Sequence, residues 1–373
     1  MTKNMKRVVI AGFGDTGVLV AAHLKAGYDV TAISTRPALV SGQELGARLT
    51  NLPLWKEKYL VGFDRLKNLD DVRIIHGKAT SINAVENSIT VRAIDGVDEA
   101  LSYDALVIAS GTTNGFWRNA DVKTDVEIVA DLQTRSETLA AAKTLAIIGG
   151  GPSAISAATN AKEQDASKDV HLFFRQPHVL AGYPEKTRAY VSRELEAQDI
   201  TLHAGHHADI PKDAPASLRG GTVNFISGQE AFDADCILWA AGQVTPNNDF
   251  IPDDMLTENG FVKVESTLRV SGHDNIFAVG DIAATDPNRS SARNAGFQTL
   301  AVNLDRFLSG RGGKMKTFKA PKYRWGSILG IRKEGLRIFT PKGGNIKVGP
   351  RMVDRVLFPV FVHRMIYRGI RKD

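Results

Sequence analysis

The sequence contains very little cysteine. Cys236 is the only one in 373 residues, which excludes an intrachain disulfide, a cysteine-based zinc site and a redox-active cysteine pair. The apolar residues around it, 234–239, predict a buried strand, where a thiol packs as a small and inert hydrophobe. Redox chemistry in this chain therefore requires a carrier other than its own thiols.

Long hydrophobic runs are also missing. The longest relevant run, residues 356–362, is much shorter than the about 20 apolar residues that a membrane-spanning helix needs. The basic residues 1–7 lead into an apolar run, 8–10, that is too short for the core of a signal peptide. We therefore expect no transmembrane anchor and a cytoplasmic location.

Acidic residues are scarce in the last part of the chain. Residues 311–373 contain 17 Lys and Arg and three acids, a net charge of +14, whereas residues 1–310 contain 30 Lys and Arg and 38 acids, a net charge of −8. This asymmetry indicates a polyanionic partner for the tail, either nucleic acid or an anionic membrane surface. No nucleic-acid recognition motif accompanies the charge, so we favour the membrane surface and expect no nucleic acid.

Glycine turns are the strongest positive signal. The apolar strand 7–11 leads into Gly12, Gly14 and Gly17, and a small-residue helix at 18–25 and the strand 28–33 follow. A strand, glycine turn, helix and second strand within about 30 residues form the fingerprint of a dinucleotide-binding unit. The glycines allow a tight turn, a close approach of pyrophosphate and close helix packing, while the helix N-terminus favours negative charge.

A second turn of the same kind occurs in the middle of the chain. Gly149, Gly151 and Ala154 follow the strand 144–148, and a helix and the strand 169–174 come next. Two such units predict two nucleotide sites. The alternative is that both are simply tight turns in α/β domains.

Two matching segments each predict a strand that joins the sheet at the end of one dinucleotide-binding unit. Segments 102–111 and 232–242 each combine an acidic turn, an apolar strand and small residues. They end at Ser110 and Gly111 in the first case and at Gly242 in the second. These strand ends are therefore candidate nucleotide contacts.

A further strand, 275–279, ends in Gly280 and Asp281, whose carboxylate can accept hydrogen bonds from a polyol. With both turns and these strand ends in order, the sequence resembles the pyridine nucleotide-disulfide oxidoreductase superfamily of FAD proteins over residues 6–310. The resemblance implies an α/β fold with two Rossmann-like dinucleotide-binding domains and a basic C-terminal segment. The expected domains are an FAD domain (1–115 and 243–310), an inserted NAD(P)H domain (116–242) and the basic segment (311–373).

The absence of a cysteine pair limits the resemblance to one branch of the superfamily. Classical disulfide reductases of this superfamily carry a cysteine pair near the position of residues 41–46 or in the inserted domain, and sulfide:quinone reductases also use cysteines. The chain looks like the cysteine-free branch, which contains type II NAD(P)H:quinone dehydrogenases, apoptosis-inducing-factor-like quinone reductases and ferredoxin or rubredoxin reductases. This implies FAD and a nicotinamide cofactor, with a quinone or a small redox protein as the external acceptor.

The two ribose-binding positions depart from the usual family pattern. Where the FAD unit commonly has an acidic residue, this chain has Ser34, with Arg36 close by. The NAD(P)H unit has Phe174 followed by Arg175. An arginine at this place resembles NADP-specific members because a guanidinium can hold the 2′-phosphate, so we favour NADPH over NADH.

The resemblance assigns further positions around the flavin. Asp281 would bind the ribitol, and a helix that begins near residues 290–298 would direct its N-terminus at the flavin ring. Quinone reductases of this type commonly have a glutamate near the nicotinamide, where this chain has Ser156. Glu44 is a candidate proton donor for quinone reduction, since its segment is expected near the isoalloxazine; a solvated loop carboxylate is the alternative.

The tail is similar in placement to the part of type II dehydrogenases that holds the quinone site, beginning with residues 318–332. Beyond Met352, apolar residues recur at helical spacing between basic ones, as in an interfacial helix, which we expect to be interrupted or kinked at Pro359. The apolar set is Val353, Val356, Leu357, Val360, Phe361, Met365 and Ile366, and the basic set is Arg351, Arg355, Arg364, Arg368, Arg371 and Lys372. The alternative is that this stripe packs on the protein's own core or forms a homodimer interface.

The favoured interpretation is an FAD-dependent NAD(P)H oxidoreductase that reduces a quinone as a peripheral protein on the cytoplasmic face of a membrane. One alternative is a soluble reductase whose basic tail docks a small acidic redox protein. Another is a flavin-binding sensor or interaction protein that has lost its nicotinamide site, as Ser156 and Phe174 suggest.

Overall fold

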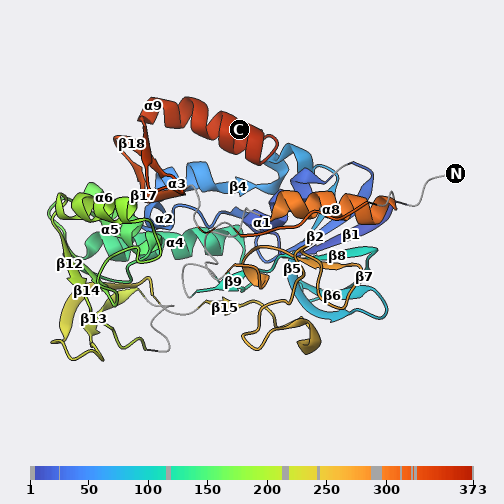
Figure 1. Ribbon diagram of the computed structural model, residues 1–373, viewed down its shortest axis with the longest axis horizontal. Coiled ribbons are helices and arrows are strands. Elements are labelled where there is room, and N and C mark those ends of the chain that lie inside the picture. Colours follow the sequence, from blue (N-terminus) through green and yellow to red (C-terminus); the bar gives the residue numbers. More distant parts are fainter. Residues whose placement is uncertain are drawn as a thin grey trace.

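The structure is a computed structural model of the 373-residue chain. It describes residues 5–24, 26–114, 119–211, 218–241, 244–286, 296–310, 313–320, 322 and 326–371. Figure 1 shows two α/β halves along the longest axis, with the C-terminal segment in red above them. This arrangement confirms the predicted fold class.

The first half is built on a seven-stranded sheet in the order β16-β8-β1-β2-β5-β6-β7. The first five of these strands are parallel, and β6 and β7 extend the sheet as antiparallel strands. The strands are β1 (Lys6–Ala11), β2 (Tyr28–Ser34), β5 (Val72–Asn83), β6 (Ser88–Ala93), β7 (Asp98–Ser102), β8 (Ala105–Ile108) and β16 (Ile276–Ala278). Helix α1 (Asp15–His23) crosses from β1 to β2 and packs beside α8 (Phe297–Ser309). Val8 and Ile10 are fully buried because a central parallel strand is covered on both faces.

The second half is a five-stranded sheet in the order β12-β11-β10-β14-β13. All of its strands are parallel except β13, which pairs antiparallel with β14. The strands are β10 (Thr144–Ile148), β11 (Asp169–Phe174), β12 (Ile200–Ala204), β13 (Arg219–Val223) and β14 (Phe232–Trp239). Helix α5 (Pro152–Gln164) crosses from β10 to β11, and α6 (Glu185–Glu196) precedes β12. Cys236 lies fully buried in β14, and burial raises the pKa of its thiol to about 12.

Helix α4 (Asp125–Ala141) leads into the second sheet and has polar groups at both ends. Thr124 and Glu127 form a capping box at its N-terminus. At its C-terminus the buried Lys168 ammonium donates to the carbonyl oxygens of Leu139 and Ala140 at 3.1 and 3.2 Å. A cation at this helix end is favoured by the helix dipole, which explains a buried lysine here.

Two chain crossings connect the halves. The short strands β9 (Thr112–Thr113) and β15 (Thr245–Pro246) run antiparallel to each other. Beside them, the Ser110 hydroxyl donates to the Asn247 carbonyl oxygen at 2.8 Å, and the Asn247 amide donates to the Ser110 carbonyl oxygen at 2.9 Å. The exact domain boundaries near 115, 242 and 310 stay a prediction.

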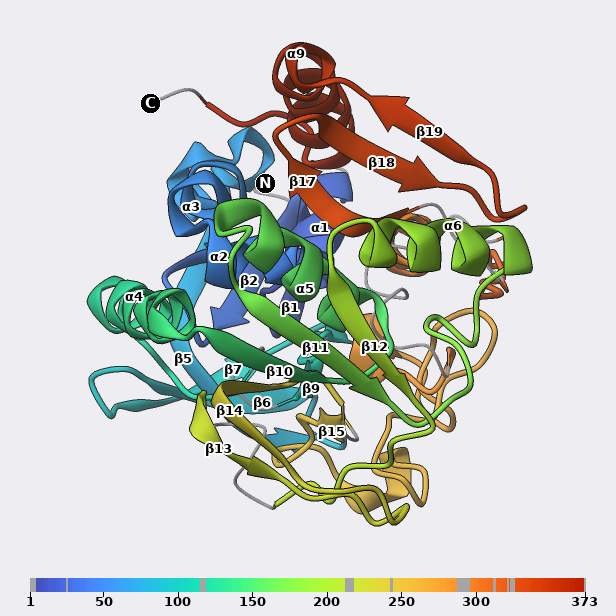
Figure 2. The ribbon, with the colours of Figure 1, turned by 90° about the vertical axis from the view of Figure 1, so that its left-hand side faces the viewer.

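The C-terminal segment contains a small sheet that the sequence pattern does not predict. It consists of β17 (Gly326–Arg332), β18 (Gly335–Phe339) and β19 (Asn345–Val348), all antiparallel. Strand β17 lies against α5 (Figure 2). There the Thr159 and Asn160 side chains donate to the Leu329 carbonyl oxygen at 2.8 and 3.1 Å. The segment is therefore attached to the second half by buried polar contacts.

The C-terminal helix begins as α9 (Pro350–Met352) and continues in wider π-helical turns over Val353–Ile366. The Tyr367 amide closes it by donating to the Val362 carbonyl oxygen, five residues back, at 3.0 Å. The helix continues through Pro359, so the predicted interruption is wrong, since wider turns displace the carbonyl that a proline ring meets in an α-helix. The alternative of a kink there stays a prediction. In the part of the chain that the structure describes, no helix is both long and apolar enough to span a bilayer.

The predicted apolar stripe on this helix is divided between two faces. Val353 and Phe358 are buried, at 2% and 4% exposure, whereas Phe361 and Met365 are 51% and 57% exposed. The inner face covers β3 (Ala38–Val40), α2 (Leu45–Thr50), α3 (Leu52–Tyr59) and β4 (Leu60–Gly62). Packing on the protein's own core thus accounts for the inner residues only.

Candidate functional site

The first glycine turn has the geometry that pyrophosphate binding requires. Gly12 has a positive φ of 101°, and a Cβ atom there would lie 2.5 Å from the carbonyl oxygen of Ala109. A Cβ atom at Gly17 would collide with the Gly12 carbonyl oxygen, because α1 packs closely against the turn. At Gly14 the same test finds nothing within 4 Å among the described residues, so an anion can approach this backbone.

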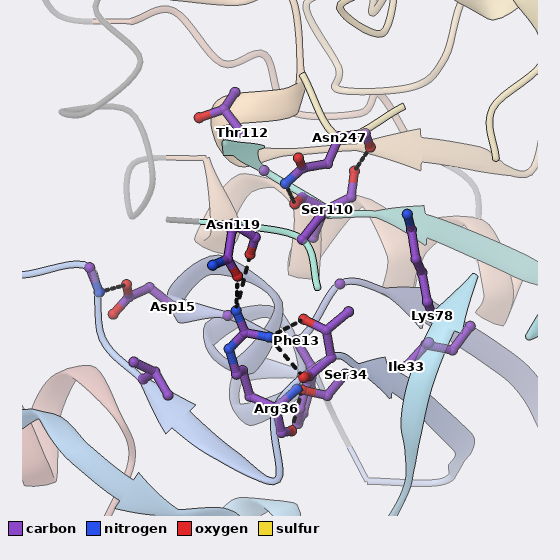
Figure 3. Close-up of a pocket in the computed structure, with 18 of the residues that line it drawn as sticks. Phe13, Asp15, Ile33, Ser34, Arg36, Lys78, Ser110, Thr112, Asn119 and Asn247 are labelled. Carbon is purple, nitrogen blue, oxygen red and sulfur yellow. Dashed lines mark hydrogen bonds between the residues drawn. The ribbon is translucent and has the colours of Figure 1, made fainter. Parts of the chain in front are cut away.

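A cavity of about 250 Å³ opens at this turn (Figure 3). The ends of β1, β2 and β8, the Gly280–Ile282 turn after β16 and the crossing segments all contribute to its wall. The predicted residues that line it are Gly12, Gly14, Ser34, Arg36, Ser110, Gly111, Gly280 and Asp281. Segments far apart in sequence therefore meet at one site.

The side chains of the predicted ribose partners Ser34 and Arg36 donate hydrogen bonds to backbone carbonyl oxygens. The Ser34 hydroxyl donates to the Arg36 carbonyl oxygen at 2.7 Å. The Arg36 guanidinium donates to the carbonyl oxygens of Asn119, at 3.2 Å, and Asp121, and thereby connects the end of β2 with the chain leaving the first half. Burial lowers the pKa of Arg36, while the Asp121 and Asp131 carboxylates oppose this shift. Arg36 thus presents a partly desolvated cation to the cavity.

Asp281 and its glycine stand where the polyol contact was predicted. Asp281 is 4% exposed and lines the cavity, and Gly280 adopts a φ of 83° beside Thr16. Helix α8 begins at Phe297 in the structure. The predicted helix start near residue 290 lies outside the described residues, so its direction toward a flavin stays a prediction.

The cavity also contains residues that the sequence analysis missed. Thr112 is 4% exposed, and within the described ranges its hydroxyl has no hydrogen-bond partner. Arg48 of α2 is 5% exposed and lies 5.5 Å from the centroid of the Trp55 ring. Lys78 and Asp249 form an ion pair of 3.0 Å at the rim. A buried hydroxyl and a buried cation fit a polar, anionic ligand such as FAD, and Thr112 follows directly after the predicted Gly111.

Asp15 is a further cavity residue outside the predicted set. It occupies a variable position of the glycine turn and is the first residue of α1. Figure 3 shows Asp15 in the cavity with one hydrogen bond to a backbone amide, which is that of Gly42 at 2.8 Å. Its carboxylate also accepts a hydrogen bond from the Ser41 hydroxyl at 2.7 Å. Glu44, the candidate proton donor, lies two residues after Gly42 with a φ of 49° and is half-buried, but it is not among the residues that line the cavity.

The second glycine turn repeats the geometry of the first. Gly149 has a φ of 137°, and a Cβ atom there would lie 2.6 Å from the Ala240 carbonyl oxygen. Gly151 faces open space in the described part of the structure, whereas Gly150 lies against Phe174. Ala154 is fully buried in α5. The backbone can therefore accept a second pyrophosphate at the N-terminus of α5.

Three other predicted positions belong to this second site. Arg175 follows β11 directly and is exposed, so its guanidinium is accessible. Gly242 lies outside the described residues. Ser156 is 6% exposed and packs against two glycines. A Cβ atom at Gly46 would collide with the Ser156 hydroxyl and backbone, and one at Gly330 would collide with the Asn160 amide and lie 3.0 Å from the Ser156 hydroxyl. Ser156 is thus a packing residue between α2, α5 and β17.

Comparison with known proteins matches residues 6–299 to the family described as pyridine nucleotide-disulphide oxidoreductase. The oxidoreductase ptaL of Pestalotiopsis fici is 27% identical over 97% of this chain and 98% of its own. The type II NADH:quinone oxidoreductase NdhA of Mycobacterium tuberculosis is 25% identical over 74% of this chain and 66% of its own. The solved structure of NDH2 from Plasmodium falciparum has a TM-score of 0.73 at 13% identity, covering 98% of this chain and 96% of that one, which supports the fold.

The family match covers both glycine turns and the Asp281 strand end. It confirms the expected FAD and NAD(P)H cofactors and the expected class of FAD-dependent NAD(P)H oxidoreductase. The chain belongs to the pyridine nucleotide-disulphide oxidoreductase family.

Proposed function

We propose that this protein delivers electrons from NAD(P)H to a quinone at an anionic membrane surface. The observation that carries the proposal is the outer face of the C-terminal helix, where Phe361 and Met365 are exposed beside Arg364 and Arg368. An apolar face flanked by arginines suits insertion into the interface of an anionic bilayer. The name of the relative NdhA, a type II NADH:quinone oxidoreductase, supports the same acceptor.

An apolar cluster links this helix to the cavity. Ile128 and Leu132 line the cavity and also pack in a cluster with Trp55, Val353 and Phe358. The cluster therefore runs from the cavity wall to the inner face of the C-terminal helix. Such apolar continuity favours an apolar acceptor that approaches from the side of this helix.

The two glycine turns have separate roles in this proposal. Gly14 and the α1 N-terminus hold the FAD pyrophosphate, while Asp281 and Thr112 bind polar groups of the same cofactor. Bound FAD supplies a two-electron carrier between the nicotinamide and the acceptor. The turn at Gly151 holds the NAD(P)H pyrophosphate, and Arg175 holds a 2′-phosphate. The remaining proposed contacts are Gly12, Gly17, Ser34, Arg36, Ser110, Gly111, Gly280, Gly149, Ala154 and Gly242.

The acceptor can be tested by anaerobic stopped flow. The bound flavin is first reduced with NADPH and then mixed with a short-chain quinone or with a small iron–sulfur redox protein. The proposal expects fast reoxidation by the quinone. Fast reoxidation by the redox protein alone would contradict it and would favour the soluble-reductase alternative.

Membrane docking can be tested by flotation with vesicles. Wild-type protein is expected to float with anionic vesicles and not with zwitterionic ones at physiological salt, since arginines flank the apolar face. Phe361→Glu should abolish flotation. Ile226→Glu is the matched control because Ile226 is also an exposed hydrophobic residue, 64% exposed, but lies in the second half. Equal loss in both variants, or no flotation of the wild type, would contradict docking by this helix.

A further inference from the structure

Asp15 places a carboxylate beside the proposed pyrophosphate site. It lines the cavity, is 8% exposed and starts the helix whose N-terminus faces the anion. Like charges at close range in a partly desolvated site repel each other, so hydrogen-bond donors to the carboxylate become more important when the site is filled. The donors to Asp15 therefore bear on how tightly FAD is held.

One of these donors comes from the opposite end of the chain. The Tyr367 hydroxyl donates to Oδ1 of Asp15 at 3.1 Å, and this oxygen also accepts the Ser41 hydroxyl. Tyr367 is 4% exposed and follows the last turn of the C-terminal helix directly. The C-terminal segment thus reaches the phosphate turn of the first half.

The residues after Tyr367 are fixed on the same half. The Lys67 amide donates to the Gly369 carbonyl oxygen at 3.1 Å. Arg371 forms a bidentate pair with Asp70, at 2.9 and 2.5 Å, and Ile370 bridges to Leu66. Tyr367 is therefore held in place from both sides, by the helix before it and by this attachment after it.

We propose that the Tyr367 hydrogen bond couples the C-terminal segment to the FAD site, so that FAD binding and the docking of residues 353–371 stabilise each other. Such coupling is reciprocal: whatever strengthens one strengthens the other by the same factor. The proposal rests on FAD binding but not on the identity of the acceptor. A surface that holds the C-terminal helix in place would also slow FAD release.

The test compares Tyr367→Phe with Tyr28→Phe. The Tyr28 hydroxyl also donates to a carboxylate, Asp305, at 2.8 Å, but Tyr28 lies at the start of β2, at the end of the sheet away from the cavity. Holoprotein is diluted, and FAD release is followed by the rise of flavin fluorescence. We expect release to be about fivefold faster or more in Tyr367→Phe, the lower range of typical coupling, and unchanged in Tyr28→Phe.

Hydrogen exchange provides a second readout that does not depend on the variants. In wild-type protein, saturating FAD should slow amide exchange over residues 353–371 compared with substoichiometric FAD. Equal release rates in Tyr367→Phe and wild type, equal acceleration in both variants, or unchanged exchange over this segment would each overturn the proposal. Protein that never retains flavin would instead contradict FAD binding itself, so the two failures are distinguishable.

Discussion

Replacing Ser156 by glutamate tests whether this position packs between helices and strands or faces the nicotinamide. Glutamate is common at this position in similar quinone reductases, but here Gly46 and Gly330 enclose the Ser156 hydroxyl. A longer side chain must displace α2 or β17, and overpacking of this kind costs about 1–3 kcal/mol. Burying the carboxylate adds a similar amount, so the variant should lose about 4 kcal/mol of unfolding free energy. An unfolding entropy of about 2.1 cal/mol/K per residue gives roughly 0.8 kcal/mol/K for 373 residues, so we expect Tm to fall by about 5 °C.

Thermal unfolding followed by circular dichroism measures this loss. Ala189→Glu is the control because it adds the same carboxylate to an exposed helical site, on α6, where Arg193 follows one turn later. Its Tm should stay within about 1 °C of the wild type. An unchanged Tm in Ser156→Glu, together with faster flavin reduction by NADPH, would refute the packing argument and indicate that the position faces the nicotinamide.

Three further predictions concern the two nucleotide sites and pH. Asp281→Asn should weaken FAD binding by about 10- to 100-fold, since a hydrogen bond to a charged group is worth about 1.5–3 kcal/mol; flavin content after purification checks this, and full occupancy would contradict it. Arg175→Ala should raise KM for NADPH about 10-fold or more and leave KM for NADH nearly unchanged; equal changes for both nucleotides would argue against a 2′-phosphate contact. Burial, and then His171 and His206, lower the pKa of His203 from 6.5 to about 4, so the folded protein binds fewer protons than the unfolded chain between these values. Stability should therefore fall by roughly 1 kcal/mol, discounted for partial exposure, as pH drops from 6.5 to 4. His203→Phe should remove this slope in urea unfolding; an identical slope in the variant would assign it elsewhere.

Elements with strong local signals were predictable from the sequence. The strand expected at 169–174 is β11 (Asp169–Phe174), because a buried apolar run there is bounded by polar residues. The first helix was expected at 18–25 and is α1 (Asp15–His23), since the turn glycines do not mark the first helical residue. The capping-box pattern of Thr124 and Glu127 was also readable and would have located α4.

Features that depend on distant contacts were not predictable. Asp15 and Tyr367 are 352 positions apart. Asp15 occupies a variable position of the glycine motif, where no residue type is expected, and Tyr367 belongs to no recognisable motif. Arg48 would ordinarily be expected at the surface, since charged residues are rarely fully buried, yet tertiary packing places it in the cavity wall. The β17–β19 sheet consists of short strands whose attachment to α5 depends on buried polar side chains of that helix. Sequence patterns carry little information about such pairings.

The pairing of β16 with β8 has a consequence for the order of folding during synthesis. Ile276 of β16 pairs with Leu106 of β8, and the whole five-stranded sheet is encoded between them. On a ribosome, the five-stranded sheet can therefore be completed while the outer sheet still lacks its last parallel strand. Gly280 and Asp281, which form part of the cavity wall, are synthesised after β16. The nascent chain thus passes through a state in which the inserted half is finished and the outer half is open, so the proposed flavin site is complete only after residue 281 has been synthesised.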